Sequence, residues 1–196
     1  MAGYVDVMCV PCCAMSGSRT IGGLAVVAGA MFLSGEAFTR VAPDIDGFAC
    51  NSGLAYLVNV VDLLKYGLMG VALLLIVRVY GNRLHRTGRI IGRVAGIGSI
   101  LAGVANGIEH CAHLEGFGAL YVAGLTSGLI ATVSFGVLLA RSRAVSSWIG
   151  WVISAGVLSF LLAAQQGGAI VAGLAWILVG TRWISSGRTT PAVAAQ

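Results

Sequence analysis

The chain has 196 residues, of which 58% are hydrophobic and only 10% are charged, and its mean hydropathy is +0.92. So few polar residues exclude an ordinary soluble domain, which needs a polar exterior to stay in water. The formal net charge of +5 is not a nucleic-acid signal either, because positive and negative residues separate along the chain. We therefore expect an all-α integral membrane protein that contacts the lipid bilayer and binds no nucleic acid.

Six apolar stretches follow one another with short connections, and each approaches the roughly 20 residues that a membrane-spanning helix needs. We predict a six-helix transmembrane bundle over residues 19–184, whose first helix is not a cleaved signal peptide. A cytoplasmic N-terminal segment covers 1–18, where Met15 is an alternative start, and a disordered cytoplasmic tail covers 185–196. The predicted spans are, in chain order, 20–38, 54–79, 94–113, 117–140, 144–164 and 169–184.

The charged residues predict the orientation of these spans. Ten of the eleven arginines fall on one side of the predicted membrane, and five of the seven acids fall on the other. Short loops rich in Lys and Arg remain in the cytoplasm. We therefore place the loop 78–93 and both termini in the cytoplasm. Together with a composition typical of bacteria, this predicts a multi-pass protein of the bacterial inner membrane.

Glycine accounts for 29 of the 196 residues and often recurs at a spacing of four. Lipid supplies no hydrophobic drive between helices, so small residues that allow close backbone approach provide much of the attraction. The spacing does not separate packing within the chain from a surface for a protein partner in the membrane. The predicted helix-packing positions are Gly92, Gly96, Gly103, Gly107, Gly124 and Gly128.

Charged residues inside the second span raise the free energy of inserting it into the membrane. A charge at the bilayer centre costs roughly 2.5–3.5 kcal/mol even on the lenient insertion scale. Asp62 and Lys65 are three residues apart, so they share a helical face and can neutralise each other. Asn59 and Tyr66 flank that face. The second span thus presents a polar stripe.

The third span has a polar stripe of its own, at a depth that matches the stripe of the second span. Its members lie within about a third of the helix circumference. Two stripes on consecutive antiparallel helices predict one shared polar cluster in the outer half of the membrane. Two interpretations stay open: neutralised charges with interhelical hydrogen bonds, or a proton, ion or substrate site. The third-span members are Ser99, Asn106, Glu109, His110 and His113.

The run from Glu109 to His113 invites a metal interpretation, because two histidines three residues apart share a helical face. A catalytic zinc needs three protein ligands and a structural zinc four, and no His-Glu-x-x-His pattern occurs. We therefore expect neither a metal nor another cofactor. The histidines are better explained as polar residues at the outer end of a helix.

The cysteines divide between the two sides of the predicted membrane. Cys50 precedes the second span and Cys111 ends the third, so both lie in the oxidising outer compartment. Adjacent helix ends fall within the Cα separation of about 4.4–6.8 Å that a disulfide requires, so we predict a Cys50–Cys111 bond. Cys9, Cys12 and Cys13 lie on the cytoplasmic side without a fourth ligand, and we assign them no function.

Three functions are compatible with these features. The small size, short loops and lack of a nucleotide motif favour a non-catalytic accessory subunit of a larger envelope complex, for instance one that moves lipids or solutes. The intramembrane charges favour the alternative, a stand-alone small carrier or proton-linked transporter. A membrane-embedded metal-dependent hydrolase ranks third, because no nucleophile–base pair is visible and no catalytic residue can be named.

Overall fold

The computed structural model describes residues 10–41, 50, 52–112, 114, 116–163 and 166–186. Within these ranges the chain is all-helical and contains no strand, which confirms the predicted all-α class. The elements are α1 (Val10–Val41), α2 (Gly53–Tyr80), the 3₁₀ turn η1 (Gly81–Arg83), α3 (Arg86–Cys111), α4 (Phe117–Ser142), α5 (Ser147–Ala163) and α6 (Gly168–Ser186).

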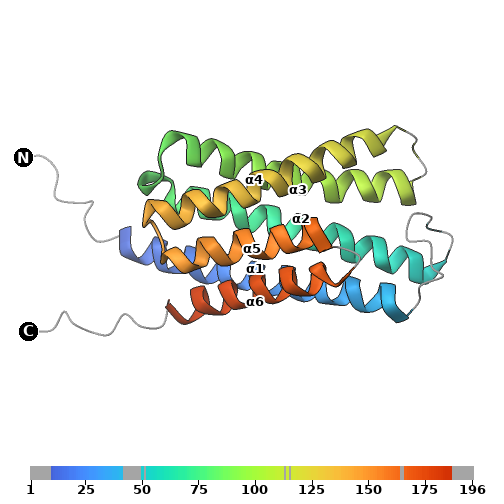
Figure 1. Cartoon of the computed structure of the whole chain (residues 1–196), viewed down its shortest axis with the longest axis horizontal. Helices are drawn as coiled ribbons and strands as arrows, with labels where there is room; N and C mark the ends of the chain where they lie inside the picture. Colours follow the sequence, from blue (N-terminus) through green and yellow to red (C-terminus); the bar gives the residue numbers. More distant parts are fainter. Residues whose placement is uncertain are drawn as a thin grey trace, which may run out of the picture.

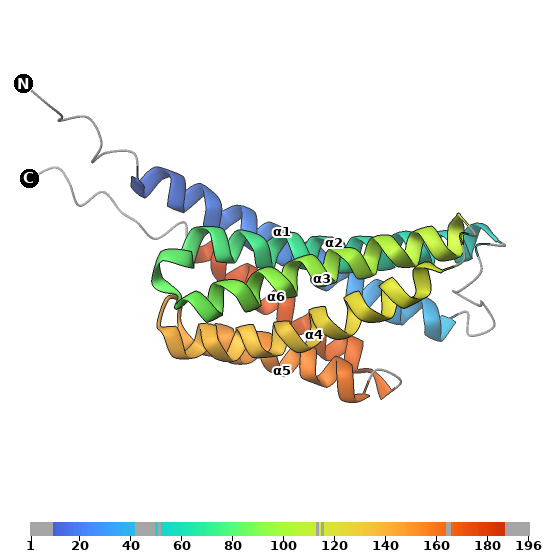
Figure 2. The ribbon, with the colours of Figure 1, turned by 90° about the horizontal axis from the view of Figure 1, so that it is seen from above.

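The six helices run up and down along one long axis (Figures 1 and 2). Each helix packs against its neighbours in sequence, and α1 packs against α6 to complete the circle. One end carries the α2–α3 and α4–α5 turns together with most of the arginines, and we call it the basic end. The opposite end, which carries Cys50 and Cys111, is called the disulfide end.

Five helices in the described part of the chain are long and apolar enough to cross a membrane, which is the pattern of a multi-pass membrane protein. The predicted fifth span, 144–164, is instead the shorter apolar helix Ser147–Ala163 of 17 residues. At about 1.5 Å per residue, α5 is roughly 14 Å shorter than the 26-residue α4. Since α4 and α5 meet at the basic end, the α5–α6 hairpin stops short of the disulfide end (Figures 1 and 2).

Two helices, α1 and α3, begin well before their predicted starts. The expected basic loop 78–93 is helical over most of its length, because α2 continues to Tyr80 and α3 begins at Arg86. Arginine is a good helix former, and the His85 side chain caps α3 by accepting a hydrogen bond from the Thr87 N–H. At the N-terminus, α1 already begins at Val10, inside the segment expected to precede the bundle. Residues 1–9 lie outside the described ranges, and so do residues 187–196, which make up most of the predicted tail.

Glycines close several helix interfaces. Gly98 of α3 lies against Gly124 and Gly128 of α4, where a Cβ added to Gly98 would lie 2.8 Å from the Gly128 backbone. Gly92, Gly96 and Gly103 also meet neighbouring helices, so five of the six predicted glycines lie at close contacts. The exception is Gly107, where an added Cβ would meet nothing within 4 Å.

The contact of α1 with α6, which closes the ring, involves glycines that the four-residue spacing did not reveal. Gly22 and Gly29 of α1 lie against Gly180 and Gly173 of α6, and a Cβ added to Gly29 would lie 2.5 Å from the Gly173 carbonyl oxygen. Each pair is spaced by seven residues, so both members lie on one face of their helix. The signal in the sequence was this seven-residue spacing.

Candidate functional site

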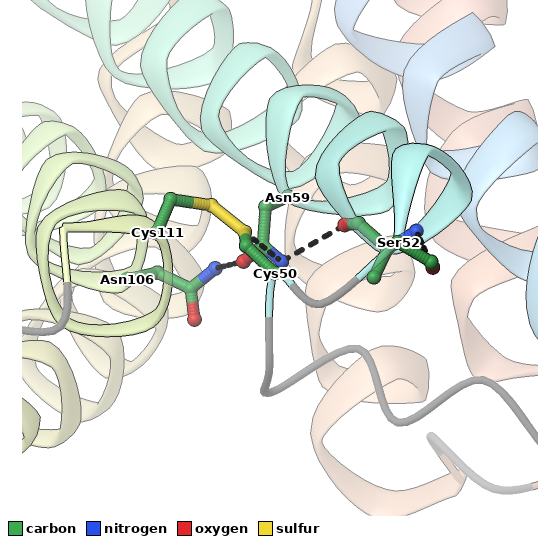
Figure 3. Close-up of a disulfide and its surroundings, with 6 residues drawn as sticks. Cys50, Ser52, Asn59, Asn106 and Cys111 are labelled. Carbon is green, nitrogen blue, oxygen red and sulfur yellow. Dashed lines mark hydrogen bonds between the residues drawn. A yellow bond between two sulfur atoms is a disulfide. The ribbon is translucent and has the colours of Figure 1, made fainter.

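The disulfide end is tied together by the predicted cysteine pair. Cys50, just before α2, and Cys111, the last residue of α3, are joined as a disulfide with their Cα atoms 5.0 Å apart (Figure 3). Ser52 caps α2 next to this bond, since its side chain accepts a hydrogen bond from the Ala55 N–H at 3.1 Å. The bond and the cap set where α2 begins relative to the end of α3.

Two asparagines link α2 to α3 beside the disulfide (Figure 3). The Asn106 Nδ2 donates to the Asn59 Oδ1 at 3.0 Å, and both side chains are buried. Asn59 in turn donates to the Ala55 carbonyl oxygen at 3.0 Å. The predicted match in depth between the two helices therefore holds at this pair of residues.

Of the cluster predicted from the two stripes, the structure brings Asn59 and Asn106 together, whereas the charged residues of α2 lie on another face of that helix. Lys65 is displaced by roughly 120° around the α2 axis from Asn59, so one face of the helix cannot present both residues to α3. Asn59 faces α3, whereas Asp62 and Lys65 face a cavity that α3 does not line. Ser99 also takes no part in the cluster, since its hydroxyl donates to the Ala95 carbonyl of its own helix.

Asp62 and Lys65 form the intrahelical ion pair that their spacing predicted, with the Lys65 Nζ 2.5 Å from the Asp62 Oδ1. The lysine ammonium also lies 4.8 Å from the centroid of the Tyr66 ring and 5.6 Å from that of Phe32 in α1. Aromatic faces attract a cation electrostatically. The charged head of Lys65 is thus held by one carboxylate and two rings.

This ion pair lines a cavity of about 790 Å³ near the disulfide end. Five helices contribute to its wall, and all except α3 take part. The two shortest helices, α5 and α6, contribute only Phe160 and Ala169 to its wall. Its lining comprises Phe32, Gly35, Glu36, Thr39, Arg40, Val58, Asp62, Lys65, Tyr66, Tyr121, Phe160 and Ala169.

A second ion pair lies in the cavity wall, outside the set of residues predicted from the sequence. The Arg40 guanidinium lies 2.9 Å from the Glu36 carboxylate, one turn away on α1. A Cβ added to Gly167 in the α5–α6 turn would lie 3.1 Å from the Arg40 Nη2, so Arg40 reaches from α1 to this turn. The i,i+4 spacing of Glu36 and Arg40 was the available signal. This spacing does not show that the face of α1 that carries the pair is turned toward α2.

Glu109 lies apart from this cavity and packs against the start of α4. A Cβ added to Gly118, in the first turn of α4, would lie 2.6 Å from the Glu109 Oε1. The Glu109 Oε2 is buried without a hydrogen-bond partner among the described residues. A helix N-terminus carries partial positive charge and favours an anion nearby, so Glu109 is stabilised electrostatically against α4.

The described residues hold no group of three His, Cys, Asp or Glu side chains that could bind a metal ion. His110 lies in the last turn of α3 and is partly buried. His113 lies outside the described residues, so the predicted His110–His113 juxtaposition stays a prediction.

Comparison with protein-family models, with curated proteins and with solved structures finds no match for this chain. The class of the protein therefore rests on its own fold and composition. Apolar helices of membrane-spanning length, closed into a ring, define a multi-pass helical protein suited to a lipid bilayer. Within that class, its distinguishing feature is a cavity lined by two ion pairs.

Proposed function

We propose that the chain is a small carrier in the inner membrane of a bacterium, and that its cavity binds a small zwitterionic solute. The observation that carries this proposal is the pairing of two cations with two anions around one cavity of about 790 Å³. Such a lining is neutral overall. A solute with no net charge can therefore enter without leaving an uncompensated charge in the low-dielectric interior.

The chemistry of the lining suggests how such a solute would lie. Lys65 and Arg40 can donate to a carboxylate or phosphate group. Asp62 and Glu36 can accept hydrogen bonds from an ammonium group or attract a quaternary one. The rings of Phe32 and Tyr66 add a further surface for a cation. Arg40, whose side chain is 58% exposed, lies at the mouth of the cavity.

Gly35 provides a sharp test because it borders the cavity. A Cβ added there would lie 3.8 Å from both the Asp62 Oδ1 and the Lys65 Nζ, so a larger side chain would fill the space beside the ion pair. Gly23, on the same helix, has nothing within 4 Å of an added Cβ. Gly35→Leu and Gly23→Leu are therefore matched changes inside and outside the cavity.

The experiment measures the melting temperature of the purified protein with glycine betaine, L-glutamine or phosphocholine, and with acetate or tetramethylammonium as single-charge controls. We expect at least one zwitterion to stabilise the wild type and Gly23→Leu but not Gly35→Leu. Uptake of that compound into proteoliposomes then tests transport. The carrier proposal fails if no zwitterion distinguishes the two variants.

A second candidate function is an accessory subunit of a larger envelope complex. It is favoured by the packed core between the cavity and the basic end, where Met69, Leu73 and Phe135 are fully buried. A subunit that only presents a solute to a partner needs access from one side alone. Extraction in a mild detergent from native cells tests it, because a stoichiometric partner supports the subunit and a monomer or homodimer supports the carrier.

A further inference from the structure

A second cavity, of about 310 Å³, lies at the basic end between α2 and α3. It shares no lining residue with the cavity described above, and neither the disulfide nor the ion pairs contribute to it. Polar surface predominates in its wall, since three arginines and an asparagine amide take part. The lining residues are Leu74, Val77, Arg78, Gly81, Asn82, Arg89 and Arg93.

Helix geometry brings the three arginines together. Arg89 and Arg93 are one turn apart on α3, so they share a face of that helix. Arg78 lies in the last turn of α2, which packs against α3. The tight connection at Gly81 joins the two helices, and a Cβ added to Gly81 would lie 3.5 Å from the Arg89 Cδ.

No carboxylate neutralises these arginines within the described chain. The acids there are Glu36, Asp62 and Glu109; the first two are paired with Arg40 and Lys65, and Glu109 packs on α4 near the disulfide end. Three guanidinium groups around one cavity repel one another unless an anion lies between them. Their planar forks of N–H donors match the oxygens of a phosphate group, which can accept two parallel bonds from each.

The wall of the cavity toward the bundle centre is apolar. Leu74 lies one turn deeper than Arg78, and it packs against Gly96 of α3. Farther along α3, Val94 and Ile97 are 44% and 51% exposed and would face lipid. A molecule with a phosphate head and an apolar tail could therefore place its phosphate among the arginines and its tail along the apolar surface of α3.

We propose that Arg78, Arg89 and Arg93 form a binding site for a phosphate ester, together with the Asn82 amide. The group could belong to the headgroup of an anionic phospholipid or to a soluble phosphate compound, and the chemistry of recognition is the same. The site is independent of the solute-binding cavity, so it stands or falls separately from the carrier proposal.

The experiment titrates the full-length protein with phosphatidylglycerol by native mass spectrometry and repeats the titration with diacylglycerol of the same chains. The test variant replaces Arg78, Arg89 and Arg93 by Gln. The matched control replaces Arg83, Arg86 and Arg143, three exposed arginines at the same end that do not line the cavity. We expect the test variant to bind phosphatidylglycerol about tenfold or more weakly, and the control to bind much like wild type.

Two further arms complete the design. A variant with Arg78→Lys, Arg89→Lys and Arg93→Lys keeps the charge but loses the forked geometry, so it should fold and bind with intermediate affinity. Inorganic phosphate as competitor separates the two sources of the phosphate group. Displacement of lipid at millimolar phosphate indicates a soluble phosphate ligand, and resistance to displacement indicates a lipid headgroup.

Equal losses of phosphatidylglycerol binding in the test and control variants would show only diffuse surface charge and would overturn the proposal. Equal binding of diacylglycerol would overturn it as well.

Discussion

A charged side chain in the interior of a membrane protein is costly unless an opposite charge, a helix dipole or water compensates it. In this protein both pairs at the large cavity lie within a single helix, Glu36 with Arg40 in α1 and Asp62 with Lys65 in α2. Each pair can therefore enter the membrane already neutralised, before the bundle assembles. This arrangement lowers the cost of inserting charged residues and leaves them available around a cavity.

The Asp62–Lys65 pair yields a prediction for single and double variants. Removing one partner leaves an uncompensated charge, which costs about 3–5 kcal/mol in a buried setting. The side chain of Asp62 is 25% exposed, so we expect a cost at the lower end of this range. We expect Asp62→Ala and Lys65→Ala each to reduce the yield of folded protein, and the double variant to recover part of it. Size-exclusion chromatography in detergent measures this yield.

The comparison also separates a structural role from a functional one. A double variant that folds but neither binds nor transports the solute supports a site at this pair. Two single variants that match wild type in both stability and activity would show that neither residue is part of the buried site.

The Asn59–Asn106 hydrogen bond gives a second prediction. Interhelical hydrogen bonds in membranes contribute about 0.6–2 kcal/mol, so Asn106→Ala should lower the melting temperature modestly. Ser99→Ala is the control, because Ser99 is equally buried but bonds only within its own helix. Equal effects of the two substitutions would mean that the asparagine pair does not hold α2 to α3.

At the scale of elements, the contact of α1 with α6 closes the ring through opposed glycines. Backbone carbonyls lie where a Cβ would otherwise be, so the two helices approach as closely as their backbones allow. Such an interface tolerates no added atom. It is therefore more sensitive to small substitutions than an interface built from large flexible side chains.

Gly29→Ala tests this interface against Gly23→Ala on the same helix. The added methyl at position 29 must displace the α6 backbone, and overpacking of this kind costs about 1–3 kcal/mol. At position 23 it meets nothing within 4 Å and should be neutral or slightly stabilising, because alanine favours helix. Thermal unfolding in the same detergent measures both, and a destabilised Gly23→Ala would contradict the assigned faces of α1.

The disulfide constrains α2 and α3 as a pair, since it closes a stretch of 61 residues. Loop-closure entropy sets an upper bound of about 4 kcal/mol for such a crosslink. The true effect should be smaller, because the helices stay confined to the membrane when their packing is lost. We expect Cys50→Ser with Cys111→Ser to lower the melting temperature, and reductant to do the same to wild type only. Peptide mapping without reduction should recover the linked pair, and free thiols at both positions would refute the bond.

At the scale of the whole molecule, the orientation in the membrane follows from the basic end. We predict that this end faces the cytoplasm, because short arginine-rich connections resist translocation. In a background without Cys9, Cys12 and Cys13, Asn82→Cys should be protected from an impermeant maleimide in intact cells. Gly116→Cys, at the other end, should be labelled. Labelling of Asn82→Cys without permeabilisation would reverse the orientation.

Much of this architecture follows from short-range patterns in the sequence, such as hydropathy, helix length and residue spacing. Hydropathy and length located the helices. The exception is the arginine-rich segment Arg86–Arg93, which was predicted as part of a loop but forms the start of α3. The Cys50–Cys111 pair was also predictable, because the ends of consecutive antiparallel helices must lie close together. The ion pair of Asp62 and Lys65 followed from their spacing alone.

The sequence by itself thus determined the membrane class, the helices and the contacts within a helix or between consecutive helix ends. Only the tertiary structure decided that Lys65 turns from Asn59 toward α1, that α6 closes the ring on α1, and that Gly107 makes no close contact. The physical reason is that a helix in lipid is apolar on nearly all sides. Its hydrophobic periodicity therefore does not indicate its inward face. Its rotation is set by where small residues let neighbouring backbones meet, which depends on all six helices together.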